Sequence, residues 1–326
     1  MNTNLVSIII PTYNRAHLIG ETLESIINQT YTDWECIIVD DGSTDGTERL
    51  LKEYSERDKR LKFYIRPKSL LKGANVCRNY GLKKSKGHYI QFFDSDDIMM
   101  PNLIGGRVSV FLENNIDIVV FNYKFLKDKK ITESINPITT VKNWEEALEH
   151  FIGSYRLPWN IITVMYKASF FKEKIYFNES LNRFQDIEFN IRLLYNLRPK
   201  FLVIPQQDCY YRLASINNIK SAQFYINIFS SVPTYYKTLD ATLSEKFFLK
   251  HVKNLQNWIF NLTSLYTNKK VSLNLYISAI NSAKKYVHID FVQYISLILL
   301  FFLKKYFKSM VGHVKIYNFL KAVFNK

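Results

Sequence analysis

The first 125 residues alternate short apolar runs with amphipathic stretches, and this alternation leaves few folds open to the chain. Runs of strand length lie at residues 5–10, 34–39, 61–65, 89–93 and 117–125. Between them, apolar residues recur at helical spacing, as they do at 18–27 and 101–113. Strands that alternate with helices form a mostly parallel sheet with right-handed crossovers. We therefore expect an α/β fold with a doubly wound, mostly parallel sheet.

Two further helices are predicted between these strands. Asp45, with Glu48 three residues later, is typical of a capping-box variant, and apolar residues follow on one helical face up to residue 54. Residues 73–85 are expected to be helical despite two glycines. Each predicted helix thus connects two predicted strands, as a parallel sheet requires.

Polar clusters follow four of the predicted strands. They are PTYNR at 11–15, DDGS at 40–43, RPK at 66–68 and DSDD at 94–97. In open α/β sheets, ligands bind beyond the carboxyl ends of the strands. Four polar clusters at those ends are hard to explain by turn chemistry alone. We expect them to form one site.

The last of these clusters crowds three carboxylates, Asp94, Asp96 and Asp97, at the end of a buried strand. Like charges this close repel one another, so their ionisation is unfavourable unless a cation neutralises them. A hard divalent cation with oxygen ligands does this and also holds phosphate oxygens. The alternative is an acidic turn before the next helix, and for a lone D-x-D-D it would be the better interpretation.

Several classes of function lose support. There is no G-x-G-x-x-G after the first strand and no G-x-x-x-x-G-K-[ST], the motifs of dinucleotide-dependent redox enzymes and P-loop proteins. Cys36, Cys77 and Cys209 are far apart and form no C-x-x-C pair, which fits a reducing compartment. The first residues lack the features of a signal peptide, so we expect a cytoplasmic location.

Four segments resemble, in order, the successive motifs of family-2 glycosyltransferases with the GT-A fold. They are SIIIPTYNR at 7–15, VDDGSTDGT at 39–47, GANVCRNYGL at 73–82 and FFDSDDIMMP at 92–101. The likeness covers about the first 125 residues continuously. It implies a nucleotide-sugar donor, with UDP as the expected nucleotide, a Mn²⁺ or Mg²⁺ ion, and inversion at the anomeric carbon.

The resemblance implies which residues contact the donor: Pro11, Thr12, Tyr13, Arg15, Asp40, Asp41, Arg78, Asp94 and Ser95. Thr12 and Tyr13 would line the base pocket, Tyr13 by stacking. Asp40 or Asp41 would accept a hydrogen bond from the base, while the other caps the turn. Arg78 would face the pyrophosphate or the donor sugar; the alternative is an ordinary solvated helix charge.

The resemblance also implies metal ligands. Asp96 would bind the ion, and Asp94 would bind either the ion or hydroxyls of the donor sugar. Asp97 is expected to accept a local hydrogen bond instead.

A catalytic base is implied in the segment NESLNRFQDIEFNIRLL. It resembles the family's Glu-Asp pair, except that Gln185 stands where the family has Glu, and Asp186 aligns with the base. Apolar residues follow at helical spacing, so Asp186 is expected in the first turn of an amphipathic helix. The alternative role is to stabilise that helix N-terminus.

Two acceptor-side residues are implied as well. Trp159 would stack on a sugar ring if it is exposed, and a core position is equally compatible with the sequence. Arg212, in a segment that resembles a Tyr-Arg region of such transferases, would reach the pyrophosphate, although the family's usual His is absent.

The C-terminal third differs from the rest of the chain. The sequence carries a net charge of +15, and residues 221–326, with fourteen Lys and three acidic residues, contribute +11 of it. Residues 291–303 contain no charge and precede three lysines. Thirteen residues are too few to span a bilayer, which takes about twenty, so this segment is either a buried helix or one lying in an anionic membrane interface.

The expected organisation is a GT-A domain over residues 1–220, with its donor half at about 1–125 and its acceptor half at 126–220, followed by a helical, basic region at 221–326. The implied activity is transfer of a sugar to a glycan acceptor in cell-surface polysaccharide biosynthesis at the inner membrane face. A lipid-linked glycan is the expected acceptor, and a polymer or protein acceptor is the alternative. A nucleotide-sugar-binding or scaffold protein without turnover is the alternative. A nucleic-acid binder is disfavoured because no basic recognition motif accompanies the charge.

Overall fold

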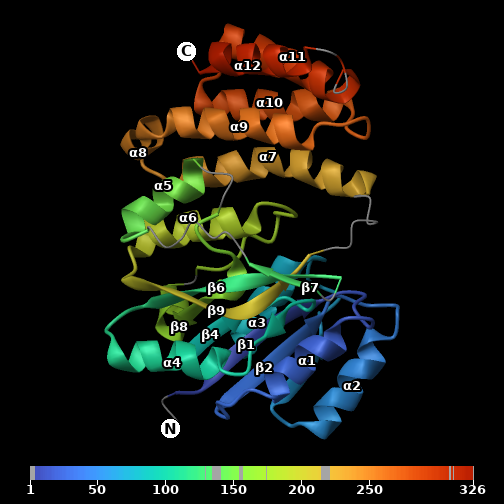
Figure 1. Cartoon of the computed structure of the whole chain (residues 1–326), viewed down its shortest axis with the longest axis vertical. Helices are drawn as coiled ribbons and strands as arrows, with labels where there is room; N and C mark the ends of the chain where they lie inside the picture. The colour runs from blue at the N-terminus through green and yellow to red at the C-terminus, as the bar shows by residue number, and fades with distance from the viewer. Residues whose placement is uncertain are drawn as a thin grey trace. The chain divides into compact units, whose positions relative to one another are not determined.

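The structure is a computed structural model that describes residues 4–128, 130–133, 141–153, 157–173, 175–213, 221–307, 310 and 312–325 (Figure 1). The chain forms two compact units. The first comprises Met1–Ala147, Pro158–Glu179 and Asn196–Asn218. The second comprises Leu148–Leu157, Ser180–Tyr195 and Ile219–Lys326. Two short segments that we expected in the transferase domain therefore belong to the second unit.

A mixed sheet forms the centre of the first unit. Its strands are β1 (Val6–Thr12), β2 (Trp34–Asp40), β3 (Leu61–Ile65), β4 (Tyr89–Phe92), β5 (Ile98–Met99), β6 (Ile118–Lys127), β7 (Lys130–Glu133), β8 (Val164–Lys167) and β9 (Phe201–Arg212). The order is β3-β2-β1-β4-β8-β6-β9-β5, and β7 pairs with β6. Strands β3, β2, β1 and β4 are parallel, as are β6 and β9, whereas β8, β5 and β7 run antiparallel to their partners. The predicted α/β fold is confirmed.

Helices α1 (Ile19–Ile27), α2 (Thr47–Arg57), α3 (Ala74–Lys84) and α4 (Leu103–Glu113) flank this sheet (Figure 1). Helix α3 packs closely on β1 and β2 because Gly81 has no side chain. A Cβ atom at Gly81 would lie 2.5 Å from Cγ2 of Ile9, a contact that side chains do not make. The glycine that weakened the helix prediction is thus what lets α3 approach the sheet.

The start of α2 differs from the expectation. Its N-terminal cap is Gly46, at φ 91°, so Asp45 precedes the cap and forms no capping box. The carboxylate of Asp45 instead accepts hydrogen bonds from the backbone N–H groups of Thr47 and Ala16, each at 3.1 Å. It therefore connects the loop after β2 to the loop after β1.

A buried ion pair joins α4 to β9. Arg107 is fully buried and donates two hydrogen bonds of 2.8 Å to the carboxylate of Asp208. Its third nitrogen donates to Gln91 Oε1 at 2.5 Å and to the carbonyl oxygen of Ile162 at 2.9 Å. All three guanidinium nitrogens of this buried arginine are thus hydrogen-bonded. These bonds fix the position of β9, the strand that ends beside the carboxylate cluster.

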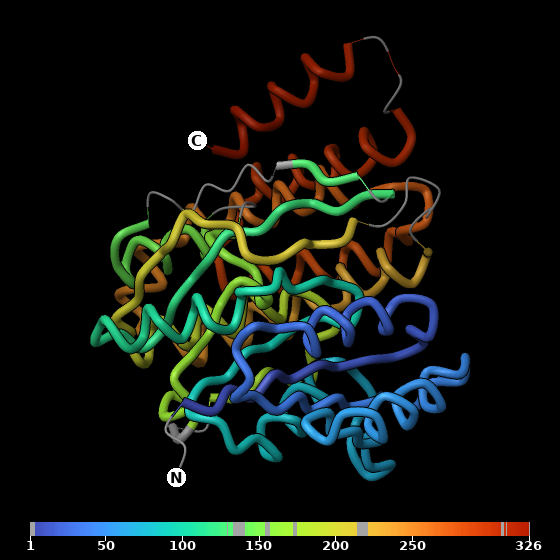
Figure 2. The backbone as a smooth tube through the Cα atoms, turned by 60° about the horizontal axis from the view of Figure 1, so that its bottom comes forward, coloured from blue at the N-terminus to red at the C-terminus, as the bar shows by residue number. Residues whose placement is uncertain are grey.

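The second unit is helical, as the sequence predicts. Helices α5 (Trp144–Gly153) and α6 (Gln185–Leu197) are followed by α7 (Ala222–Thr242), α8 (Glu245–Lys250), α9 (Val252–Tyr266), α10 (Leu273–Val287), α11 (Phe291–Tyr306) and α12 (His313–Phe324). The caps of α7, α8, α10 and α11 are Ser221, Ser244, Ser272 and Asp290, whose side chains each accept a backbone N–H three residues on. The trace of the last helices, α11 and α12, lies at the outside of this unit (Figure 2).

Aromatic contacts fill the core of the helical unit. Tyr235 stacks on Trp258 with ring centroids 4.6 Å apart, and Tyr276 stacks on Phe301 at 4.4 Å. Among the described residues, no helix is long and apolar enough to cross a membrane.

Candidate active site

Strands β1 and β2 bring the first two polar clusters together. The strands are parallel and in register, so Thr12 lies beside Asp40, and the backbone N–H of Asp41 donates to the carbonyl oxygen of Thr12 at 2.9 Å. Beyond the strands, the N–H of Asn14 donates to Ser43 Oγ at 2.8 Å. Pro11 and Thr12 are buried at the end of β1.

The two neighbouring aspartates after β2 have different partners. Asp40 is buried and accepts hydrogen bonds from the backbone N–H of Ser43, at 2.9 Å, and from its hydroxyl. It is therefore the residue that caps the turn. Asp41 forms an ion pair with Arg66, Nε to Oδ1 at 2.5 Å, which attaches the third polar cluster to the second.

Two arginines neutralise the carboxylates after β4. Arg78, buried on α3, donates from Nη2 to Asp94 Oδ1 at 2.8 Å. Arg15 Nε lies 3.6 Å from Asp96 Oδ2, too far for a hydrogen bond, and both side chains are partly exposed. Ser95, between the two aspartates, is buried. The first and fourth clusters therefore meet, and all four predicted clusters lie at one edge of the sheet.

Burial and neighbouring negative charge raise the pKa values of two carboxyl groups in this loop, Asp96 and Asp97. Burial and the nearby Asp94 carboxylate raise the pKa of Asp96, and Arg15 opposes this only in part. Burial, together with Asp94 and Asp96, holds the pKa of Asp97 well above its usual range. An added cation would relieve this repulsion and favour the ionised carboxylates.

Asp97 accepts hydrogen bonds, but its partners are distant in the sequence and not local as expected. Its Oδ1 accepts the backbone N–H of Arg212 at 2.8 Å, and its carbonyl oxygen accepts the hydroxyl of Thr22, also at 2.8 Å. The loop is thus fixed from β9 on one side and from α1 on the other.

The structure gives Arg212 a different role from the expected contact with pyrophosphate. Its Nε donates to the carbonyl oxygen of Asp96 at 2.7 Å, and its Nη2 pairs with Glu21 Oε2 at 2.5 Å. Arg212 therefore holds the backbone of the carboxylate loop. Sequence reasoning missed this because the two residues lie 116 positions apart.

Tyr13 offers an accessible aromatic ring beside this cluster. The residue is 41% exposed, and Nζ of Lys72 lies 4.0 Å from its ring centroid. Lys72 comes from the loop between β3 and α3 and was not among the predicted site residues. A cation over an aromatic face is attracted by the ring's electron density, so this surface suits a planar base followed by phosphate.

Among the described residues, the buried polar atoms near the strand ends that lack a hydrogen-bond partner include Oγ1 of Thr12, Nε of Arg78 and Oδ2 of Asp97. Buried polar groups are nearly always satisfied, by protein, water or ligand. A hydroxyl and a guanidinium N–H in this position suit a ligand that carries carbonyl and phosphate oxygens.

Trp159 corrects one expectation. It is 1% exposed and packs edge to face on Phe201, with ring centroids 5.4 Å apart. It is a core residue of the first unit and offers no face to a sugar.

Asp186 lies in the first turn of α6, within the second unit, and is half-buried. Its carbonyl oxygen accepts a hydrogen bond from Asn190 Nδ2 at 2.7 Å. The nearby Glu188 is fully buried and paired with Arg192 at 2.5 Å, so its carboxylate is committed to the helix.

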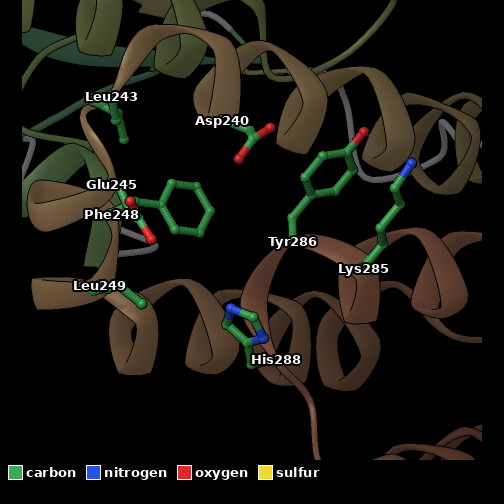
Figure 3. A pocket seen from close by; sticks show the side chains of 8 residues that line it. All are labelled: Asp240, Leu243, Glu245, Phe248, Leu249, Lys285, Tyr286 and His288. Carbon is green, nitrogen blue, oxygen red and sulfur yellow. The ribbon is translucent and has the colours of Figure 1, made fainter.

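A separate hollow lies entirely within the helical unit (Figure 3). Its volume is about 440 Å³, and the residues lining it come from the ends of α7, α8 and α10: Asp240, Leu243, Glu245, Phe248, Leu249, Lys285, Tyr286 and His288. None of the strand-end residues contributes to it. It is therefore distinct from the candidate active site.

Comparison with known proteins decides the family. The sequence profile described as "Glycosyl transferase family 2" matches residues 7–177, which is more than half of the chain. The chain belongs to glycosyl transferase family 2. The matched residues include the strand-end clusters and stop short of α6, so Asp186 lies outside them.

Two relatives illustrate the range of the match. The chain is 39% identical over 131 residues to UDP-Glc:alpha-D-GlcNAc-diphosphoundecaprenol beta-1,3-glucosyltransferase WfgD of Escherichia coli, covering 40% of this chain and 50% of that protein. It thus matches only half the length of that enzyme. It is 31% identical over 226 residues to the uncharacterized glycosyltransferase MJ1057 of Methanocaldococcus jannaschii, covering 68% of this chain and 75% of the other.

Among solved structures, S. aureus TarS 1–349 in complex with UDP-GlcNAc resembles the present chain over nearly the whole length of both chains. The TM-score is 0.62 at 22% sequence identity, covering 98% of this chain and 90% of the TarS chain. At this identity the likeness concerns the fold, and it extends through the helical region.

The carboxylates after β4 of this glycosyltransferase suit a divalent cation that is coordinated by protein and ligand together. Among the described residues, no group of three or more His, Cys, Asp or Glu side chains forms a metal site on its own. Asp96 and Asp94 are partly exposed, and burial together with the Asp94 carboxylate raises the pKa of Asp96. Mg²⁺-type ions are commonly held by one or two carboxylates together with substrate phosphates, and this loop supplies such a set.

Proposed function

We propose that this family-2 glycosyltransferase transfers a sugar, with inversion, from a UDP-sugar to a hydroxyl of a glycan acceptor. The observation that carries the proposal is the Asp94–Asp97 loop at the strand ends, set among Arg15, Arg78 and Arg212. The loop thus presents carboxylates and arginines side by side. A nucleoside diphosphate with its metal ion matches both groups. Its phosphate oxygens pair with the arginines, and its metal ion pairs with the carboxylates.

Arg15 and Arg78 have different tasks in this proposal. Arg15 makes a long contact of 3.6 Å with Asp96 and is partly exposed, so it can exchange that contact for a phosphate oxygen at small cost. Arg78 is buried, bonded to Asp94 and to Asn75, and keeps Nε for the donor. Tyr13 stacks on the base, and Asp41, held by Arg66, accepts the base N–H.

Asp96 would hold the Mn²⁺ or Mg²⁺ ion, with Asp94 as a second ligand or as a contact to the donor sugar. When bound, such an ion stabilises the negative charge on the departing nucleoside diphosphate. The chain's own residues then orient the donor: Arg78 through its guanidinium, and Arg212 by fixing the loop that carries Asp96.

Asp186 is proposed as the general base. A carboxylate within reach of the acceptor hydroxyl takes its proton while the oxygen attacks the anomeric carbon. Gln185 beside it adds no charge but retains hydrogen-bonding capacity. Its amide is suited to orienting an acceptor hydroxyl.

The proposed acceptor is a lipid-linked glycan in cell-surface polysaccharide biosynthesis, reached from the cytoplasmic side by an enzyme peripheral on the inner membrane face. The name of the E. coli relative describes a sugar acceptor on diphosphoundecaprenol. The +11 charge of residues 221–326 suits work near an anionic surface. Both observations favour a lipid-linked acceptor over a soluble one.

The test uses purified full-length chain, Mn²⁺, a lipid-linked N-acetylglucosamine diphosphate acceptor and a panel of UDP- and GDP-sugars. We expect UDP release, growth of the acceptor by one sugar, and an inverted anomeric configuration by NMR. Reaction with GDP-sugars alone would contradict the nucleotide assignment, and a retained configuration would contradict the mechanism. A thermal shift with a UDP-sugar but no release with any acceptor would support the alternative of a nucleotide-sugar-binding protein without turnover.

A further inference from the structure

Helix α11 exposes an apolar stripe along its whole length. The stripe consists of Phe291, Val292, Ile295, Leu299, Phe302 and Tyr306, each between 36% and 74% exposed. At 3.6 residues per turn these six side chains fall within an arc of about 100° on one side of the helix. Large apolar side chains that line up in this way form a patch, which single exposed residues do not.

The opposite side of α11 belongs to the core. Leu297, Leu300 and Phe301 are fully buried. Phe301 stacks on Tyr276, whose hydroxyl donates to the carbonyl oxygen of Leu297 at 3.0 Å. The apolar run at 291–303 is therefore both core and surface, divided by helical face. Removing the helix would expose the core, so point substitutions on the stripe are the way to test the surface.

The surroundings of the stripe are basic. Residues 291–326 contain six lysines and no acidic residue. Lys315 and Lys321 are exposed on α12, and α12 packs against α11. A second copy of this chain on the stripe would bring two such lysine sets together without a counter-charge. An anionic lipid surface supplies both the apolar layer and the opposite charge.

We propose that the α11 stripe inserts into the headgroup region of an anionic bilayer while the α12 lysines contact lipid phosphates. The inference deepens the proposed function, on which it rests for the lipid-linked acceptor, by naming the face that meets the membrane. The helix lies flat in the interface, because its core side stays bound to α10 and α9.

The experiment measures co-sedimentation of the full chain with phosphatidylcholine vesicles, with and without phosphatidylglycerol. We expect binding only to the anionic vesicles, weakened by salt because exposed charges are screened. Leu299→Gln should weaken binding about tenfold through lost apolar insertion. The double variant Lys315→Gln/Lys321→Gln should weaken it about fivefold for each lysine, the equivalent of about 1 kcal/mol.

Matched controls lie elsewhere on the same unit. Leu265→Gln on α9 changes a leucine that is 60% exposed, and Lys246→Gln/Lys253→Gln removes two exposed lysines of α8 and α9. Each control should bind like the parent chain. Circular dichroism and thermal melting check that Leu299→Gln, which touches only the surface, keeps the parent's stability.

Three outcomes would overturn the inference. One is equal binding of the parent and Leu299→Gln to anionic vesicles. Another is a concentration-dependent dimer in sedimentation velocity that Leu299→Gln abolishes while vesicle binding is unchanged, which would make a second copy the occupant. A third is no binding by the parent at low salt. UDP release is measured in parallel without vesicles. If no UDP were released, the proposed function would be contradicted, but the vesicle result would still test the stripe.

Discussion

Nε of Arg212 donates a hydrogen bond of 2.7 Å to the carbonyl oxygen of Asp96, and the backbone N–H of the same arginine donates to the carboxylate of Asp97 at 2.8 Å. The last residue of β9 thus holds the loop after β4 by two bonds. Arg212 acts on the candidate metal ligand through the loop backbone, which makes it a positioning residue.

Arg212→Lys should weaken Mn²⁺-dependent donor binding about tenfold, since one hydrogen bond from a charged donor is lost and the loop is free to shift. Isothermal titration with the UDP-sugar that proves active, in the presence and absence of Mn²⁺, measures this. Glu21→Gln is the matched control, because it changes the exposed partner of the guanidinium and leaves the bond to Asp96. If Arg212→Lys weakened donor binding only in the absence of Mn²⁺, Arg212 would instead contact the donor's phosphate directly.

Asp96→Ala should abolish sugar transfer while the fold remains, because Asp96 is partly exposed and its carboxylate lies 3.6 Å from Nε of Arg15, too far for a hydrogen bond. Initial rates across a Mn²⁺ titration measure the effect. Glu113→Ala, at an exposed acid at the end of α4, should leave the rate unchanged. Near-normal turnover of the Asp96 variant in EDTA would refute the metal assignment.

Asp186→Asn should lower the rate of transfer by roughly 10²–10⁴, the usual contribution of a general base. Donor affinity should barely change, since the residue is assigned to the acceptor. Measuring kcat with the lipid-linked acceptor alongside the donor's dissociation constant separates the two effects. If both fell together with the melting temperature, Asp186 would be a structural residue of α6.

Glu35 should make stability depend on pH. Its burial opposes ionisation, but hydrogen bonds from Lys62, Ser7 and the backbone N–H of Lys86 outweigh burial and lower its pKa. A lowered folded-state pKa contributes stability above the unfolded value of about 4.3, and this contribution is lost as pH falls through the folded value.

Glu35→Gln should therefore destabilise the chain by about 1–3 kcal/mol at pH 7 and by less near pH 3, where the parent's carboxylate becomes protonated. Urea unfolding at both values of pH measures the difference. Lys62→Gln should show the same trend more weakly, because Ser7 and Lys86 remain as donors. An equal loss at both values of pH would mean that packing, and not charge, stabilises Glu35.

The local pattern of the sequence was enough for the elements of the donor half. The predicted strand at 61–65 is β3 (Leu61–Ile65), and the predicted helix at 73–85 is α3 (Ala74–Lys84). Apolar runs and helical spacing reflect burial on the two faces of a sheet, which is a property of neighbouring residues. The convergence of Asp41, Arg66 and Asp96 at one edge followed because parallel strands end together.

The tertiary structure decided which partner each side chain takes. Arg212 reaches Asp96, and Arg107 reaches Asp208, over about a hundred residues of sequence, because β9 pairs with β5, the short strand between the carboxylate loop and α4 in the chain. Gly46 adopts a positive φ, so the expected capping box at Asp45 does not form. Trp159 enters the core because Phe201 packs against it.

In helix α11, the sequence pattern predicts the helix, and tertiary packing decides which side of it is buried. Residues 291–303 contain no charge, and the polar residues Gln293 and Ser296 are themselves buried, so no polar face of the segment indicates its orientation. Tyr276 selects the buried side by stacking on Phe301 and bonding to the carbonyl oxygen of Leu297, and the stripe from Phe291 to Tyr306 is left outside. The sequence alone determined that a helix forms here; only packing against α10 decided which of its apolar residues meet solvent, because burial depends on residues distant in the chain.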